Sequence, residues 1–223
     1  MPRFSILLPV HNDQDTLAQC LDSILLQSFK DYIICIVLNN STDSSLHIIE
    51  NHPLFKIGLI DLRITEPNIN NLPLALNFGI SILAGRSHYI VRMDADDLMH
   101  PLRLARTNEF LRISDYQSVI HCGNAKLLSS RVLLLNHPNI IDSRQMSQYL
   151  KTQLLLASPF VHPSIAFKNQ SLTLYNPHFT YAQDLKFFID NIRCGVFSYD
   201  PRLYLYYRDP VSNPRKRELQ LHL

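Results

Sequence analysis

The sequence predicts an α/β fold, in which a mainly parallel sheet is covered by helices on both faces. Short runs of apolar residues alternate with segments whose apolar residues recur at helical spacing. The alternation repeats about every 30 residues, which is the length of a βαβ unit. The runs are continuously apolar, as is typical of parallel strands that are buried on both faces. A length of 223 residues, with 46% hydrophobic and 18% charged residues, suits one sizeable globular core.

The first half of the chain carries the regular alternation. Leu17 and Leu21 belong to the apolar stripe of the first helix, Ser41 or Thr42 can cap the second, and Pro73 suits the first turn of the third. In chain order, the expected elements are a strand at 4–10, a helix at 13–27, a strand at 32–38, a helix ending near 50, a strand at 57–64, a helix at 73–83, a strand at 88–93 and a helix at 101–113.

The pattern changes after residue 113, where helices and strands no longer alternate regularly. The elements expected there are a short strand at 118–122, an irregular hairpin at 125–136, a helix at 143–156, an extended segment at 164–167 and a helix at 184–193. Residues 1–208 contain no repeat or low-complexity linker and are expected to form one domain. Residues 209–223, with the basic run Arg215-Lys216-Arg217, are expected to form a loosely held tail.

Three polar loops follow the first, second and fourth expected strands. They are His11-Asn12-Asp13, Asn39-Asn40-Ser41 and Asp94-Ala95-Asp96-Asp97. Ligands of parallel α/β sheets bind outside the carboxyl ends of the strands. The three loops are therefore expected to meet at one edge of the sheet and to form a binding site there.

The acidic loop, Asp94 to Asp97, places three carboxylates within four residues. Carboxylates this close repel one another unless something positive lies among them, and Mg²⁺ binds one or two carboxylates together with phosphate oxygens and water. A solvated acidic turn before the helix at 101–113 is the alternative. The position of the cluster at the end of a strand, beside two other polar loops, favours a metal site.

Two further polar residues lie in the second half of the chain. Asp184 precedes an apolar helical stretch, so a helix N-cap is the favoured interpretation from the residues alone, with a general base as the alternative. His162 lies before an extended run, where a lone histidine is more often structural than catalytic.

Several classes of protein are disfavoured. The five glycines are too far apart for a dinucleotide-binding GxGxxG motif or a P-loop, and no GxSxG motif of a serine hydrolase is present. A nucleotidyltransferase of similar sheet architecture lacks the expected basic, glycine-rich N-terminal loop. A net charge of +2 is too small to indicate nucleic acid as a partner.

The location is expected to be the cytoplasm. The apolar run at 4–10 is too short for a signal-peptide core or a membrane span, and no later run is long enough to span. Four widely spaced cysteines suit a reducing compartment. Any lipid-linked partner would then be reached by peripheral contact with the inner face of the cell membrane. Arg208 and the basic run at 215–217 are candidates for contact with anionic lipid or the acceptor, although so few charges favour a solvated terminus.

An ordered series of segments resembles the family 2 glycosyltransferases, which are inverting enzymes of the GT-A fold. The series covers nearly the whole chain, from about Phe4 to Arg208. Its members are SILLPVHN at 5–12, LDSILLQSF at 21–29, ALNFGI at 75–80, RMDADD at 92–97, PLRL at 101–104, HPS at 162–164, YAQD at 181–184 and YYR at 206–208.

The resemblance implies a nucleotide-sugar donor, a divalent metal (Mg²⁺ or Mn²⁺) and a glycan or lipid-linked acceptor. It implies hexosyl or N-acetylhexosaminyl transfer in the synthesis of a surface polysaccharide or a lipopolysaccharide. It assigns residues 1–113 to the nucleotide-sugar-binding half and 114–208 to the acceptor-side half. The implied roles are metal binding by Asp96, general base catalysis by Asp184, donor binding by Pro9, Val10, His11, Asp13, Asn39, Asn77, Asp94 and Asp97, and acceptor-side contacts by His162 and Gln183.

The chain departs from the family pattern at three places. Leu38-Asn39-Asn40 replaces the usual acidic residues, the glycine expected near Asn71 is missing, and Gln183 replaces an acid. The amide oxygen of Asn39 can still accept a hydrogen bond from a nucleobase, but it carries no charge. These departures favour a second interpretation, a catalytically weak or inactive nucleotide-sugar-binding partner subunit.

Overall fold

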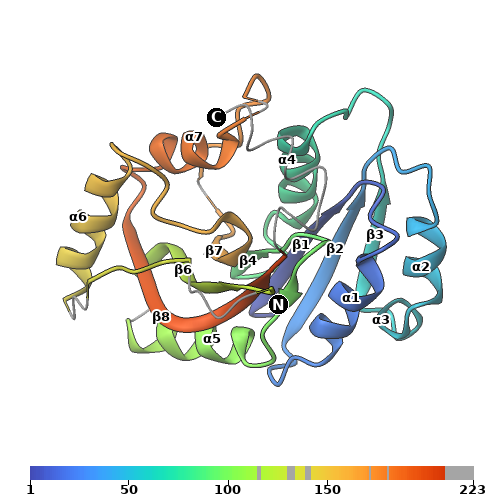
Figure 1. Ribbon diagram of the computed structural model, residues 1–223, viewed down its shortest axis with the longest axis horizontal. Coiled ribbons are helices and arrows are strands. Elements are labelled where there is room, and N and C mark those ends of the chain that lie inside the picture. The colour runs from blue at the N-terminus through green and yellow to red at the C-terminus, as the bar shows by residue number, and fades with distance from the viewer. Residues whose placement is uncertain (115–116, 130–133, 139–141, 171, 180, 209–223) are drawn as a thin grey trace.

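A computed structural model describes residues 1–114, 117–129, 134–138, 142–170, 172–179 and 181–208. These residues contain one eight-stranded sheet with the strand order β3-β2-β1-β4-β7-β6-β8-β5, flanked by helices (Figure 1). The strands are β1 (Phe4–Val10), β2 (Tyr32–Leu38), β3 (Ile60–Ile64), β4 (Tyr89–Arg92), β5 (Leu98–Met99), β6 (Ser118–Leu127), β7 (Ile165–Lys168) and β8 (Val196–Tyr207). The helices are α1 (Leu17–Leu25), α2 (Ser45–Asn51), α3 (Pro53–Lys56), α4 (Leu72–Leu83), α5 (Arg103–Ile113), α6 (Ser143–Gln153), the 3₁₀ turn η1 (His162–Ser164) and α7 (Gln183–Asp190).

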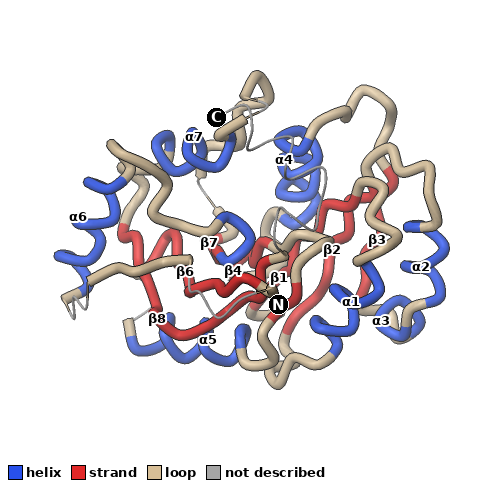
Figure 2. The backbone as a smooth tube through the Cα atoms, viewed as in Figure 1, coloured by secondary structure: helices blue, strands red, loops and turns tan. Residues whose placement is uncertain are grey.

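Strands β1 to β4 confirm the predicted parallel sheet. β1 pairs in parallel with both β2 and β4, and β2 pairs in parallel with β3. Alternate residues of β1 point to opposite faces: Ile6 and Leu8 pack in the core that includes α1, whereas Leu7 packs in the core that includes α4. Apolar residues of α2, α3 and α5 join the first core, and those of α6 and α7 join the second. The sheet is therefore covered on both faces, as the sequence predicts (Figure 2).

The second half of the sheet is mixed rather than parallel. β7 is antiparallel to β4 and β6, β5 is antiparallel to β8, and β6 is parallel to β8. The irregular hairpin expected at 125–136 is wrong at its start, because β6 continues to Leu127. The twelve-residue strand β8 has no counterpart in the sequence prediction.

The pairing of β6 with β8 is irregular where Pro201 interrupts β8. Gly123 lies opposite Asp200 and Asn124 lies opposite Leu203, so two extra residues of β8 bulge out of the ladder. Bulges are where a proline, which has no N–H to donate, is tolerated within a strand. Gly123 also allows the close approach of the Tyr204 ring, since a Cβ at this position would lie 1.9 Å from a ring carbon.

Smaller differences concern the ends of elements. Helix α2 begins at Ser45, so the expected capping by Ser41 or Thr42 is wrong, and the hydroxyl of Ser41 instead accepts a hydrogen bond from the backbone of Asn12. The expected strand at 57–64 begins only at Ile60, because the short helix α3 precedes it. The tail at 209–223 lies outside the described residues. Among the residues that the structure describes, no helix is both long and apolar enough to cross a bilayer.

The imidazole of His121 is buried and forms hydrogen bonds through both ring nitrogens. It forms hydrogen bonds of 2.9 Å with the Ser198 hydroxyl and the Tyr204 hydroxyl, and it is fully buried. Burial lowers the pKa of His121 to about 4, an effect that Arg103 and Arg202 reinforce and Asp200 opposes. The ordinary value of about 6.5 applies in the unfolded chain.

We expect the free energy of unfolding to fall as the pH drops from about 6.5 to about 4. In that window the unfolded chain binds a proton that the folded His121 does not, which costs up to about 3 kcal/mol. His121→Gln, which cannot titrate, should flatten this pH dependence in urea titrations. His47→Gln, at an exposed position of α2, is the control, and an equal flattening in both variants would contradict the assignment to His121.

Candidate functional site

The three polar loops meet at one edge of the sheet, as the order of the strands requires. β1 lies between β2 and β4, and all three strands run in the same direction. The loops after β1 and β2 are joined directly: the Asn39 N–H donates to the Val10 carbonyl over 2.8 Å, and the Asn12 N–H donates to the Ser41 hydroxyl over 3.0 Å. A ring nitrogen of His11 lies 2.7 Å from the Asn39 carbonyl oxygen.

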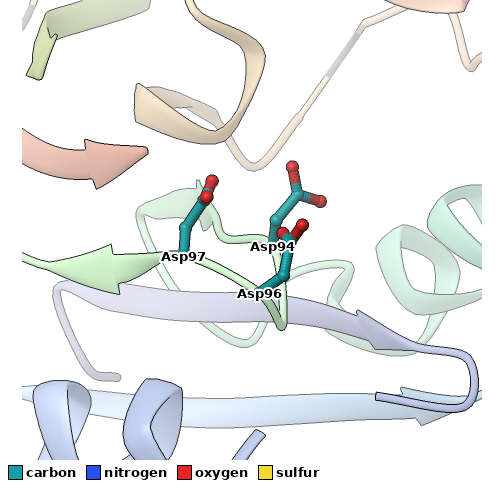
Figure 3. A group of neighbouring side chains, drawn as sticks. All are labelled: Asp94, Asp96 and Asp97. Carbon is teal, nitrogen blue, oxygen red and sulfur yellow. The ribbon is translucent and has the colours of Figure 1, made fainter. Parts of the chain in front are cut away.

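The acidic loop that follows β4 brings three carboxylates together. One carboxylate oxygen from each of Asp94, Asp96 and Asp97 lies within 4.8 Å of the others. Figure 3 shows the three side chains projecting to the same side of the loop. Asp97 is fully buried, and Asp96 is 7% exposed. The alternative of a solvated acidic turn is therefore wrong.

Buried guanidinium groups partly balance this charge. Arg92, at the end of β4, is almost completely buried and forms an ion pair with Asp94. Burial alone would lower the pKa of Arg92. The net effect is to raise it, because the guanidinium is attracted by Asp94, Tyr175 and Asp97. Arg103 lies behind it and donates to the Arg92 carbonyl over 2.9 Å. Burial lowers the pKa of Arg103 to about 10, so this group also stays charged at neutral pH.

Arg208 ties the acidic loop to the end of β8. Its backbone N–H donates to a carboxylate oxygen of Asp97, and its Nε donates to the Asp96 carbonyl, both over 2.8 Å. Its Nη2 donates to Gln19 of α1 over 3.0 Å. The sequence prediction places Arg208 in the YYR segment of the resemblance and groups it with the basic tail, but it assigns Arg208 no role at the acidic loop.

The carboxylates of the site act electrostatically on Cys20 of helix α1. The buried thiol of Cys20 donates to the Asp94 carbonyl over 3.4 Å. Burial raises the pKa of Cys20, and the carboxylates of Asp97, Asp96, Asp94 and Asp13 raise it further, in that order. Asp13, from the loop after β1, therefore contributes to the same negative region as the acidic loop.

Two of the amides expected on the donor side have partners within the protein. The side-chain oxygen of Asn39 accepts hydrogen bonds from the Thr65 hydroxyl over 3.1 Å and from Asn40 over 3.4 Å. Asn77, on α4, uses both ends of its amide on the backbone of Tyr175, donating over 2.7 Å and accepting over 2.8 Å. Asn77 thus holds the segment before α7 against α4.

Asp184 lies in the first turn of α7, directly after Gln183. The N-cap position belongs to Ala182, which has a left-handed backbone with a φ of 50°, so the N-cap interpretation of Asp184 is wrong. Within the described ranges, the Asp184 carboxylate has no hydrogen bond or ion pair. Burial raises the pKa of the Tyr175 hydroxyl, and the carboxylates of Asp184 and Asp94 both raise it further against the opposing effect of Arg92. Asp184 and the acidic loop therefore approach the same buried phenol.

His162 lies beneath the site rather than on its surface. It is 9% exposed, and its Nε2 lies 2.8 Å from the Tyr175 hydroxyl. Burial lowers the pKa of His162 well below its ordinary value, and the nearby Arg92 lowers it further while Asp94 opposes the change. The imidazole is therefore neutral at physiological pH, which agrees with a structural role.

The residues of the acidic loop fit a hard divalent cation. They offer carboxylate oxygens, the ligands that Mg²⁺ and Mn²⁺ prefer, from a loop that Arg208 holds through two hydrogen bonds. Among the described residues, this is the one group of three or more candidate ligands close enough to hold a metal ion.

The Arg92–Asp94 pair predicts a large effect on stability. Arg92→Met removes one partner of a largely buried ion pair and leaves Asp94, 23% exposed, without its counter-charge. We expect the free energy of unfolding to fall by about 3 kcal/mol, the lower end for such pairs because Asp94 retains some contact with water.

Urea denaturation should then show that the double variant Arg92→Met/Asp94→Asn recovers part of the lost free energy of unfolding, because the unpaired Asp94 carboxylate has been removed. The matched control is Arg86→Met, which breaks a surface pair with Asp61 and should cost less than about 1 kcal/mol. Equal losses in Arg92→Met and Arg86→Met would contradict the importance of burial.

Comparisons with known proteins identify relatives of the chain. The sequence profile of glycosyl transferase family 2 matches residues 5–180. The chain is 32% identical over 122 residues to the putative glycosyltransferase EpsE of Bacillus subtilis, a match that covers 55% of this chain and 43% of EpsE. It is 30% identical over 131 residues to the poly(ribitol-phosphate) beta-glucosyltransferase of Bacillus spizizenii, covering 58% of this chain and 20% of that protein.

Solved structures share the fold. The S. aureus TarS fragment 1–349, determined with UDP, superposes with a TM-score of 0.71 at 16% identity, covering 97% of this chain and 64% of the fragment. The mannosyltransferase PcManGT of Pyrobaculum calidifontis, determined with GDP-Man and Mn²⁺, gives a TM-score of 0.69 at 18% identity and covers 99% of this chain and 60% of that one. The GT-A fold prediction is confirmed, and the chain spans less than two thirds of each of these four proteins.

Proposed function

Because the chain belongs to glycosyl transferase family 2, we propose that it transfers a sugar from a nucleotide-sugar donor to a glycan or lipid-linked acceptor with inversion at the anomeric carbon. The transferred group is of the hexosyl or N-acetylhexosaminyl class. The relative that acts on poly(ribitol-phosphate) supports an acceptor of the surface-polysaccharide kind. The protein would act in the cytoplasm, with peripheral contact to the inner face of the cell membrane.

The observation that carries the proposal is the buried acidic loop at the carboxyl ends of parallel strands. Asp96 would bind Mg²⁺ or Mn²⁺, which when bound stabilises the negative charge of the leaving diphosphate. Asp97 holds the loop through Arg208, and Asp94 faces the nucleoside while paired with Arg92. The neighbouring structures with UDP or with GDP-Man and Mn²⁺ support a donor and a metal of these kinds.

The remaining residues divide between the two substrates. Residues 1–113 would form the donor-binding half, with the nucleobase lying against Pro9, Val10, His11, Asp13 and Asn39. Asn77 would contribute to the donor side by holding Tyr175 in place. Residues 114–208 would form the acceptor-side half, where Gln183 faces the acceptor and His162 supports the site from below.

Asp184 would act as the general base. Its carboxylate takes the proton of the acceptor hydroxyl while the hydroxyl oxygen attacks the anomeric carbon. Attack from the face opposite the diphosphate inverts the configuration of that carbon. The partly exposed position of Asp184 at the start of α7 would leave its carboxylate accessible to an acceptor.

The test is donor turnover. The purified protein is incubated with Mn²⁺ or Mg²⁺ and a panel of UDP- and GDP-sugars, with and without glycan acceptors, and nucleotide release is measured. Metal-dependent release of one nucleotide supports the proposal. Its absence with every donor, together with no nucleotide binding in calorimetry, would contradict it.

A second candidate function is nucleotide-sugar binding without turnover, as a partner subunit. The engagement of the Asn39 side-chain oxygen with Thr65 favours it, because that oxygen is the expected acceptor for a nucleobase N–H. Calorimetry discriminates between the two functions. Donor binding with no release under turnover conditions supports the second.

A further inference from the structure

Tyr175 joins three separate elements beneath the candidate site. It lies in the segment between β7 and α7 and is 1% exposed. Its hydroxyl lies 2.8 Å from Nε2 of His162 in η1. Its backbone N–H and carbonyl are both bonded to the Asn77 amide on α4. The residue is therefore fixed at its side chain and at its backbone.

The ring of Tyr175 connects this anchor to α7. It stacks on the Phe187 ring with a centroid separation of 4.2 Å and an interplanar angle of 11°. Phe187 is itself buried and follows Asp184 by three residues on α7, so the two side chains lie on the same face of the helix. The stack of Phe187 against Tyr175 therefore packs the face of α7 that carries Asp184 against this anchor.

Tyr175 and His162 both lie within electrostatic reach of the Arg92–Asp94 ion pair. Arg92 and Asp94 act electrostatically on both Tyr175 and His162, so the ion pair at the end of β4 lies beside the Tyr175–His162 hydrogen bond. The carboxylates of Asp94 and Asp184 both act electrostatically on the Tyr175 phenol.

We propose that Tyr175 is a positioning residue, which sets the location of Asp184 relative to the acidic loop. This inference rests on the proposed function, in which Asp184 is the base and the acidic loop holds the donor. Misplacing a catalytic group by about 1 Å can cost about a hundredfold in rate. The buried contacts of Tyr175 would hold Asp184 at a fixed distance from the acidic loop and so prevent such a loss of rate.

The test compares two tyrosines that each lose one buried hydroxyl. Tyr175→Phe keeps the ring stack and the Asn77 bonds but loses the bond to His162. We expect kcat to fall about tenfold while the donor KM and the nucleotide-binding stoichiometry stay within twofold. Phe187→Leu, which keeps an apolar group but removes the stack, should give the same pattern. The matched control is Tyr32→Phe, whose buried hydroxyl bonds to the Ile24 carbonyl of α1, and its kcat should stay within twofold of the wild type.

The proposal is overturned if kcat of Tyr175→Phe stays within twofold of the wild type. It is also overturned if nucleotide binding falls in proportion to kcat, which would indicate general damage to the fold. If the wild type releases nucleotide from no donor, the proposed function fails, and hydrogen exchange decides the positioning role separately. Faster exchange of the amides at 183–190 in Tyr175→Phe, but not in Tyr32→Phe, would then support it, and unchanged exchange would contradict it.

Discussion

Replacing Asp96 with Asn is expected to lower the rate of nucleotide release at least about a hundredfold. A metal ion contributes several kcal/mol of charge stabilisation in reactions of this type, and each 1.4 kcal/mol corresponds to about tenfold in rate. Asn keeps the size of the side chain but removes the charge that would hold the cation. Asp96 is 7% exposed, so water cannot readily replace the lost carboxylate.

Two measurements check this expectation. Calorimetry should show weaker binding of Mn²⁺ to Asp96→Asn, and raising the Mn²⁺ concentration should recover part of the rate. Glu50→Gln, at an exposed position of α2, removes the same charge far from the acidic loop and should leave the rate within about twofold. An Asp96→Asn variant that retained both Mn²⁺ affinity and rate would show that the metal is held elsewhere.

The location of this site could be predicted from the sequence because its strands are unambiguous. The segments at 4–10 and 32–38 are continuously apolar, and both become strands with these bounds. Polar loops that follow parallel neighbouring strands must meet at one edge of the sheet. The burial of Asp96 and Asp97 could not be predicted in the same way, because it depends on Arg208 and on segments far away in the chain.

Strand β8 could not be predicted from the hydrophobic pattern of its own residues. Asp200-Pro201-Arg202 interrupts its apolar residues, and a proline normally argues against a strand interior. The strand forms because β6 accepts the extra residues in a bulge, with Gly123 leaving room for Tyr204. These features belong to the pairing of two strands rather than to either sequence alone.

The contacts of Arg208 and Tyr175 could not be predicted from the sequence either. The bond between Arg208 and Asp97 joins residues 111 positions apart, and the bonds between Asn77 and Tyr175 join residues 98 apart. Motif similarity marks Asn77 and Arg208, but it does not indicate which groups their side chains contact. The position of Asp184 relative to the acidic loop could be established only from these long-range contacts.

Replacing Asp184 with Asn is expected to lower kcat by about 10²–10⁴-fold, the usual range for loss of a general base. The amide cannot take the proton of the acceptor hydroxyl, whereas the shape of the side chain is nearly unchanged. The donor KM should stay within about twofold, because the proposed nucleotide-binding residues lie in the other half of the site. The matched control is Asp190→Asn on the same helix, which breaks only an i, i+4 pair with Lys186 and should leave kcat within about twofold.

The responses of the two variants to metal separate their roles. Added Mn²⁺ should recover part of the activity of Asp96→Asn but none of that of Asp184→Asn, because a cation cannot replace a missing base. Nucleotide affinity measured by calorimetry in the presence of Mn²⁺ should fall for Asp96→Asn and remain unchanged for Asp184→Asn. If Asp184→Asn instead loses nucleotide affinity and recovers with Mn²⁺, its carboxylate acts on the donor side and the base must be sought elsewhere. Full activity in both variants would contradict the assignment of both roles.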